Sequence, residues 1–99
     1  MSNSSTITED LSTPGEILVE EYLEPLGISR YRLAKDIHVD ESRISRIVNG
    51  KQAISPDTAI RLSAYLGTTA EFWLNLQMHY DLMVARSHVN TSDITPAVA

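Results

Sequence analysis

The segment from Ser29 to Gly50 constrains the fold most, because it holds two short runs of helical apolar periodicity separated by a tight turn. The apolar positions recur at spacings of three and four residues, and they are Leu33, Ala34 and Ile37 in the first run and Ile44, Ile47 and Val48 in the second. Two short helices at a steep angle, joined by a tight turn, are what a helix-turn-helix requires, so the pattern predicts two crossed helices.

Local signals place the ends of these two helices. Ser29 is a predicted N-cap of the first helix. The second, Asp40–Gly50, is predicted to be capped by its first residue and stopped by its last. Ala34 is small enough to let the helices approach closely. His38 stands in the turn where glycine is common, and histidine tolerates a positive φ better than most residues. The pattern predicts a helix-turn-helix with Asp40–Gly50 as its second helix.

Three more helices are predicted, and they run from Thr13 to Leu26, from Ser55 to Leu66, and from Thr68 to Arg86. Thr13 and Glu16 predict a capping box, as do Thr68 and Glu71, and Pro25 is expected to distort the last turn of its helix. Since no segment alternates as a strand does, the predicted fold class is all-α with five helices. The expected organisation is a flexible arm at residues 1–12, a helix-turn-helix domain at 13–86 and a flexible tail at 87–99.

Charge is distributed unevenly along the chain. The formal net charge of −5 at pH 7 argues, by itself, against binding to nucleic acid. Residues 29–51 nevertheless hold six basic and three acidic side chains, whereas the rest of the chain holds two basic and ten acidic ones. Phosphate binding depends on the local potential of the docking face. The basic segment is therefore compatible with DNA, and the acidic remainder with a basic protein partner or simply with a well-solvated surface.

The polar residues of the second crossed helix and its neighbours are candidate DNA contacts. Arg43 and Arg46 share one helix face, and an arginine can donate two hydrogen bonds to guanine O6 and N7. The start of the preceding helix offers backbone N–H groups to a phosphate. The predicted DNA-binding residues are Ser29, Arg30, Tyr31, Asp40, Glu41, Ser42, Arg43, Ser45, Arg46, Asn49 and Lys51. The alternative is that these side chains form only a solvated surface.

Three longer blocks give the chain a resemblance to a known family. They are PGEILVEEYLEPLGIS (Pro14–Ser29), RLAKDIHVDESRISRIVNGKQAIS (Arg32–Ser55) and AIRLSAYLGTTAEFWLNLQMHYDL (Ala59–Leu82). The second block alone indicates only a helix-turn-helix, whereas the first and third, with WLNLQ at Trp73–Gln77, make the resemblance specific. In these blocks the chain resembles the HigA-type antitoxins, within the Xre family of repressors similar to phage lambda repressor.

The resemblance implies a homodimer of a five-helix lambda-repressor-like fold that binds double-stranded operator DNA, an inverted repeat in its own promoter. It also implies a HigB-type toxin partner, a ribosome-dependent mRNA endonuclease of the RelE-like class, which the antitoxin neutralises and which acts as co-repressor. The toxin-binding residues do not follow from the motif. Two alternatives stay open: a solitary Xre-type transcriptional regulator without a toxin partner, and an interaction module with a vestigial DNA-binding face.

The last predicted helix has two apolar faces. One broad sector holds Phe72, Trp73, Leu76, Tyr80, Met83 and Val84, and a second stripe holds Leu74, Met78 and Leu82. A surface helix of a monomer needs only one apolar face, so two faces predict that one of them packs against a second subunit. The periodicity does not decide which face does so. The candidate dimerisation residues are Leu74, Met78 and Leu82, and packing of this stripe against the tails is the alternative.

Several other classes of protein are disfavoured. The chain has no cysteine, so it can form neither disulfides nor a thiolate metal site. It has no apolar run of roughly 20 residues and no signal-peptide pattern at its start, which favours a cytoplasmic protein without a membrane segment. His38, His79 and His88 match no metal-binding spacing, and no nucleophile elbow or phosphate loop is present. We therefore predict no catalysis, no metal and no cofactor.

Overall fold

The computed structural model describes residues 12–98, and within this range every regular element is helical. The elements in chain order are α2 (Pro14–Ile17), η1 (Leu18–Leu23), α3 (Glu24–Leu26), α4 (Arg30–Ile37), α5 (Glu41–Val48), α6 (Pro56–Leu66) and α7 (Ala70–Arg86). Since α2, η1 and α3 follow one another without a break, they form the first of five helices. The predicted all-α, five-helix fold is therefore confirmed. The arm predicted at residues 1–12 lies outside the described residues, apart from its last residue.

The first helix begins as predicted but is less regular than expected. The Thr13 hydroxyl accepts a hydrogen bond from the Glu16 backbone N–H at 3.1 Å, and the Glu16 carboxylate accepts one from the Thr13 N–H at 2.9 Å. The middle of the helix, η1, is wound as a wider π-helix. A proline ring collides with the carbonyl four residues earlier in a regular helix, and we attribute the wider turns ahead of Pro25 to that collision. The distortion therefore lies before the last turn, and Gly27 ends the helix at φ +67°.

Helices α4 and α5 form the predicted helix-turn-helix. The Ser29 hydroxyl caps α4 by accepting from the Arg32 N–H at 3.0 Å. His38 has the left-handed conformation expected in the turn, with φ +65° and ψ +48°. Asp40 occupies the cap position of α5, but its side chain makes no capping hydrogen bond. Its backbone carbonyl instead accepts from the N–H of Arg43 at 3.0 Å. Asp40 is therefore the N-cap residue, as predicted, but it caps α5 without its side chain, which is exposed.

The predicted cap at the start of α7 is wrong. Thr69, and not Thr68, accepts a hydrogen bond from the Phe72 N–H, at 3.0 Å. The helix begins one residue later than the Thr68–Glu71 capping box required. The Thr68 hydroxyl has another partner, because it accepts from the indole N–H of Trp73 at 2.7 Å. Trp73 is completely buried, so this contact satisfies a polar atom that burial would otherwise leave unpaired.

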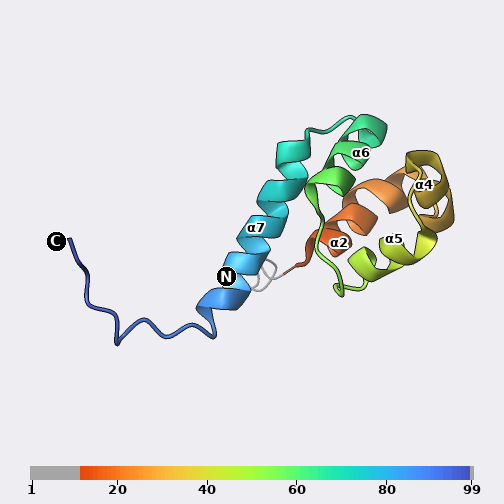
Figure 1. The fold of residues 1–99 in the computed structure, drawn as a ribbon. Coiled ribbons are helices and arrows are strands. Elements are labelled where there is room, and N and C mark those ends of the chain that lie inside the picture. Colours follow the sequence, from red (N-terminus) through yellow and green to blue (C-terminus); the bar gives the residue numbers. More distant parts are fainter. Residues whose placement is uncertain (1–11, 99) are drawn as a thin grey trace, which may run out of the picture.

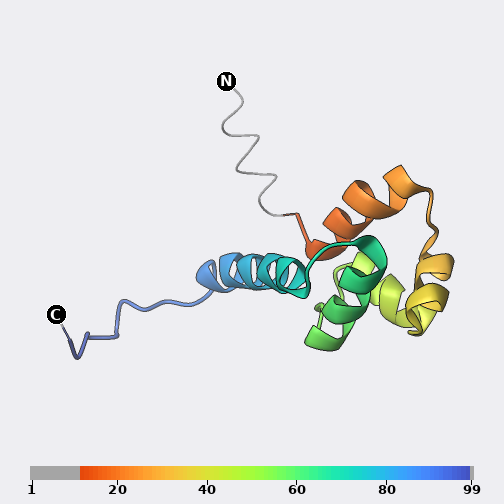
Figure 2. The same ribbon diagram turned by 90° about the horizontal axis from the view of Figure 1, so that it is seen from above.

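The core lies where the helices meet, with α7 on one side of the molecule and α4 and α5 on the other (Figures 1 and 2). Its buried apolar residues come from each of the five helices and from the loop before α6, and they are Leu18, Leu23, Leu33, Ala34, Ile37, Ile44, Ile47, Val48, Ile54, Ala59, Leu62 and Trp73. Both apolar runs of the helix-turn-helix are buried as predicted. Three aromatic rings lie together where the first turn of α7 meets the first helix. The Trp73 ring centre is 5.3 Å from that of Tyr22 and 5.0 Å from that of Phe72.

Gly15 lets the first helix touch the end of α5. A Cβ atom built on Gly15 would overlap the backbone carbonyl of Ile47 and lie 2.8 Å from the Cα atom of Val48. Only a residue without a side chain permits this approach. The contact fixes the C-terminal end of α5 against the first helix, a constraint that the sequence pattern did not indicate.

Helix α7 continues beyond the body of the molecule, and the segment after it runs further away (Figure 2). Leu74 packs against the core. Met78 and Leu82 remain 57% and 44% exposed. All residues from 87 to 98 are exposed. Among the helices of residues 12–98, none is both long enough and apolar enough to cross a lipid bilayer.

Candidate nucleic-acid interface

Most of the residues predicted to contact DNA lie on or beside the outward face of α5, a helix whose opposite face is buried in the core. Ile44 and Ile47 are 0% and 2% exposed, so they fix the rotation of α5 about its own axis. The predicted DNA-binding residues that are exposed on or beside α5 are Asp40, Glu41, Ser42, Arg46, Asn49 and Lys51. Arg43 and Ser45 are half-buried, so they are less accessible than the other candidates on α5.

The start of α4 lies beside the end of α5. Ser29, Arg30 and Tyr31 are exposed there, although the Ser29 hydroxyl already accepts the capping hydrogen bond within α4. Arg30 and Asn49 line the same surface hollow, so the structure brings the two predicted groups together. Glu16, Glu20 and Glu24 of the first helix also line this hollow. A carboxylate-rich border there would oppose the approach of phosphate from that side.

Arg46 is held by the loop that follows α5. Its Nε atom donates a hydrogen bond of 2.7 Å to the Oε1 atom of Gln52. The Gln52 side chain is neutral, so Arg46 keeps its full positive charge and the remaining N–H donors of its guanidinium. Sequence reasoning did not pair these two residues, because they lie six positions apart across the end of the helix.

Arg43 faces a carboxylate from α6. Its Nη1 atom lies 3.9 Å from Oδ1 of Asp57, and the same oxygen accepts a hydrogen bond of 2.6 Å from Nε of Arg61. Arg61 also donates from Nη1 to the backbone carbonyl of Ile37 at 2.8 Å and approaches that of His38 at 3.4 Å. Sequence reasoning missed this network. The i,i+4 spacing of Asp57 and Arg61 would predict their pairing, but nothing local predicts the contacts to α4 and α5.

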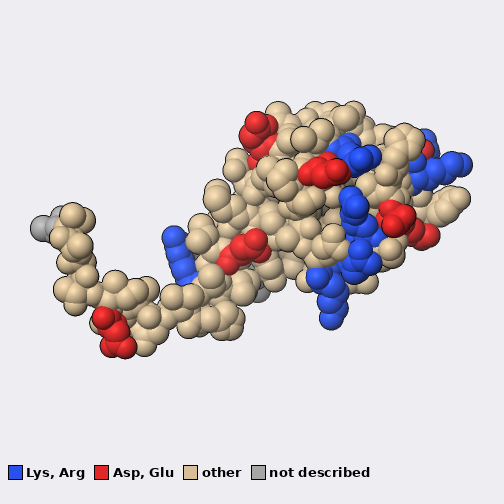
Figure 3. Space-filling model, in the orientation of Figure 1, with Lys and Arg blue, Asp and Glu red and all other residues tan. Residues whose placement is uncertain are grey.

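Most of the basic side chains visible in Figure 3 lie on the half of the molecule that carries α4 and α5, with acidic side chains between them, and one lies at the other end, beside the tail. One acidic group there is strongly hydrogen-bonded. The Tyr65 hydroxyl donates to Asp36, and this bond together with nearby Arg32 holds the pKa of the Asp36 carboxyl below its usual value. The same hydrogen bond raises the pKa of Tyr65. At neutral pH both groups keep their ordinary charge states, so Asp36 stays anionic.

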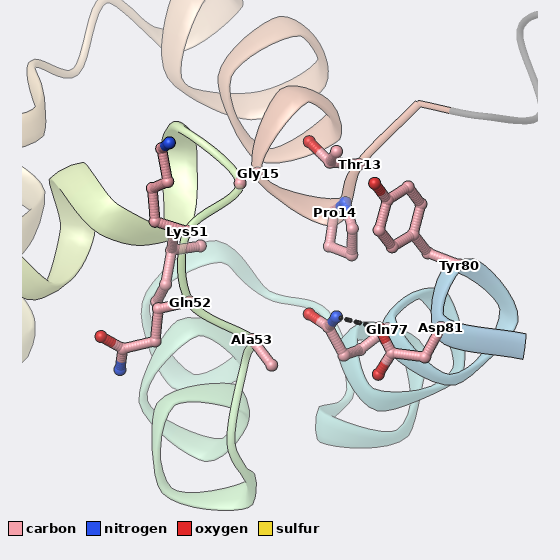
Figure 4. Close-up of a pocket in the computed structure, with 11 residues that line it drawn as sticks. Thr13, Pro14, Gly15, Lys51, Gln52, Ala53, Gln77, Tyr80 and Asp81 are labelled. Atoms are coloured by element: carbon pink, nitrogen blue, oxygen red, sulfur yellow. Dashed lines mark hydrogen bonds between the residues drawn. The ribbon is translucent and has the colours of Figure 1, made fainter. Parts of the chain in front are cut away.

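A small hollow lies between the start of α2, the loop after α5 and α7 (Figure 4). Gln77 lines this hollow, where its side-chain carbonyl oxygen accepts from the Ile54 N–H at 2.8 Å and its amide donates to Asp81 at 2.9 Å. The hollow measures about 150 Å³, below the ~300–1,000 Å³ of typical small-molecule sites. Its hydrogen bonds tie the loop after α5 to α7. In the part of the chain that the structure describes, no three His, Asp or Glu side chains lie close enough to hold a metal ion.

Known proteins share this arrangement. The helix-turn-helix family model matches residues 19–73. The chain is 49% identical to virulence-associated protein I of Dichelobacter nodosus, over 82% of this chain and 75% of that protein. It is 44% identical to antitoxin HigA-1 of Vibrio cholerae, over 74% of this chain and 69% of that protein. The Pseudomonas aeruginosa antitoxin HigA, solved with the higBA promoter, superimposes with a TM-score of 0.78 at 39% identity, covering 89% of this chain and 95% of that one. This chain therefore belongs to the helix-turn-helix family, in the group that includes the HigA antitoxins.

Proposed function

We propose that this protein is a HigA-type antitoxin that represses transcription by inserting α5 into the major groove of operator DNA. The observation that carries the proposal is the outward face of α5, where Arg43 and Arg46 stand on a helix fixed from behind by Ile44 and Ile47. A helix with this design fits the width of the major groove and offers arginine donors to guanine. A promoter complex of a 39% identical relative supports the same use of the fold.

The other candidate residues divide into two roles. Ser42, Ser45 and Asn49 can bond base edges or nearby phosphates from α5 itself, whereas the α4 start and Lys51 are suited to the phosphate backbone. Asp40 and Glu41 can accept hydrogen bonds from cytosine amino groups. The eleven candidates are thus the two arginines together with Ser29, Arg30, Tyr31, Asp40, Glu41, Ser42, Ser45, Asn49 and Lys51.

We infer a homodimer formed through the exposed stripe of α7. Of the three candidates, Leu74 packs on the core of its own chain, so Met78 and Leu82 supply the apolar surface available to a partner. The described part of the tail leaves both of these side chains exposed. A two-fold dimer would present two copies of α5 to half-sites about 34 Å apart, one turn of B-DNA.

The toxin partner is the finer part of the proposal. A HigB-type, RelE-like mRNA endonuclease is the partner that the family resemblance implies, and relatives named antitoxins support it. Co-expression of this chain with the product of a small neighbouring reading frame tests the point. Recovery of a stable complex that relieves growth arrest is the expected result, whereas a neighbourhood without such a gene would favour a solitary Xre-type regulator.

The double variant Arg43→Ala with Arg46→Ala tests the DNA-binding part. Each well-formed arginine–guanine pair is worth ~1–3 kcal/mol of discrimination, so together they predict a loss of operator affinity of at least about 30-fold. Arg86→Ala is the matched control, because Arg86 is an exposed arginine at the far end of α7. Fluorescence anisotropy should show the loss for the double variant only, with unchanged helical content. Equal affinity of all three proteins would refute the reading role of α5.

A further inference from the structure

We propose that Asp57 is a specificity-determining positioning residue, which holds Arg43 for base recognition and opposes binding to DNA of arbitrary sequence. This inference rests on the proposed function. Its geometric basis is a single carboxylate oxygen, Asp57 Oδ1, that lies 2.6 Å from Nε of Arg61 and 3.9 Å from Nη1 of Arg43. Two guanidinium groups, one on α6 and one on α5, therefore share one anion.

The carboxylate is itself anchored. Arg61 binds Asp57 through Nε and binds the last carbonyls of α4 through Nη1, with 2.8 Å to Ile37 and 3.4 Å to His38. These carbonyls are among those that a helix end leaves unpaired, so Arg61 completes the C-terminus of α4 while fixing Asp57. The position of the Asp57 oxygen is thereby tied to the helix-turn-helix itself. Asp57 can hold Arg43 in one place relative to both helices.

Arg43 remains able to bind a second partner while it is held. Its side chain is 36% exposed, and the 3.9 Å contact to Asp57 involves only Nη1, so the other N–H groups of the guanidinium are available to a base. The 3.9 Å distance is long for a hydrogen bond and suits electrostatic orientation. A base edge would therefore meet an arginine that is already aimed. Such an arginine would lose less rotamer freedom on binding than a mobile arginine would.

The same carboxylate carries a negative charge at the DNA-facing surface. The Asp57 side chain is 57% exposed, so part of its carboxylate faces solvent. A phosphate placed near Arg43 without the correct base contacts meets that charge as well. The phosphates of any DNA meet this repulsion, but only operator DNA gains in return from the aimed arginine. Asp57 should therefore widen the gap between the two affinities.

Asp57→Asn tests this inference, because it keeps the shape and removes the charge. We expect affinity for a random duplex to rise about threefold to tenfold at low salt, since one repulsive charge is lost. We expect the ratio of operator to random-duplex affinity to fall about tenfold, within the range that one arginine–base pair supplies. Glu71→Gln is the matched control, because it removes one exposed carboxylate from the first turn of α7. It should change the ratio less than about twofold.

A double-mutant cycle with Arg43→Ala separates positioning from other causes. If Asp57 acts through Arg43, Asp57→Asn should change the affinity ratio by less than about twofold in the Arg43→Ala background. The inference is overturned if the full change persists there, if Asp57→Asn shifts both affinities equally, or if it lowers both together with the melting temperature. Failure of Arg43→Ala alone to weaken operator binding would instead refute the proposed function.

Discussion

Replacement of Gly15 by alanine should destabilise the protein, although helix propensity alone predicts the opposite. In a helix interior alanine is favoured over glycine by ~0.8–1.0 kcal/mol, and this is the upper limit of the gain at Gly15, which lies in the first turn of α2 without a positive φ. The added Cβ, however, would overlap the Ile47 carbonyl and lie 2.8 Å from Val48 Cα. Both of these are backbone atoms of α5, which cannot turn aside as a side chain can.

The size of the effect follows from these opposing contributions. Overpacking of a closed contact typically costs ~1–3 kcal/mol, with the upper part of that range expected against backbone. After subtraction of the helix gain, the net loss is about 1–2 kcal/mol. For a domain of this size that corresponds to a fall in melting temperature of roughly 5–15 °C.

Thermal unfolding followed by circular dichroism, at one protomer concentration, measures this loss. Gly67→Ala is the control, because Gly67 has φ +75° with nothing within 4 Å of an added Cβ. It should lose ~1–2 kcal/mol from backbone strain alone and keep its operator affinity. Gly15→Ala should lose operator affinity as well, since α5 must shift. A Gly15→Ala protein as stable as the parent would refute the close-packing argument.

Two further predictions concern the surface. Tyr65→Phe removes the hydrogen bond that lowers the pKa of Asp36, so that pKa should rise toward its ordinary value of 3.8 in an NMR titration. Because the pKa of Asp36 is lower in the folded than in the unfolded protein, the hydrogen bond stabilises the fold above the unfolded-state pKa, and this stabilisation is lost as the pH falls through the folded-state pKa. The variant should therefore lose less stability in acid than the parent does. An unmoved Asp36 pKa would contradict this. Met78→Glu with Leu82→Glu should give a monomer by light scattering, because two charges enter the proposed dimer face. A dimer that persists would exclude that face.

The sequence predicted those features that depend on neighbours within about four residues. The buried stripes of α4 and α5, the Ser29 cap and the positive φ of His38 all follow from local spacing and backbone preference. The Thr68 cap failed because its hydroxyl pairs with the buried Trp73 indole, and a neighbouring threonine can cap equally well. A local motif does not show which of two adjacent threonine hydroxyls will bind a side chain elsewhere in the core and which will cap the helix.

The candidate site was predictable in its residues but not in their couplings. The arginines of α5 could be assigned to the outward face from periodicity alone. The link from Arg61 to Ile37 joins residues 24 positions apart, and it depends on how α6 docks beside the turn. The contact of Gly15 with Ile47 likewise depends on the approach of two helices distant in sequence. Such contacts arise from packing of the whole core, which periodicity does not encode.

The most direct test of the central claim is an NMR titration of the ¹⁵N-labelled protein with duplex DNA taken from upstream of its own gene. We expect the largest amide shifts at Arg30–Tyr31 and from Glu41 to Lys51, with small changes in the second half of α7. A scrambled duplex should give weaker, salt-sensitive shifts over the same residues. Shifts concentrated on α7, or none in α5 at saturating DNA, would contradict the assignment of α5 as the helix that reads DNA.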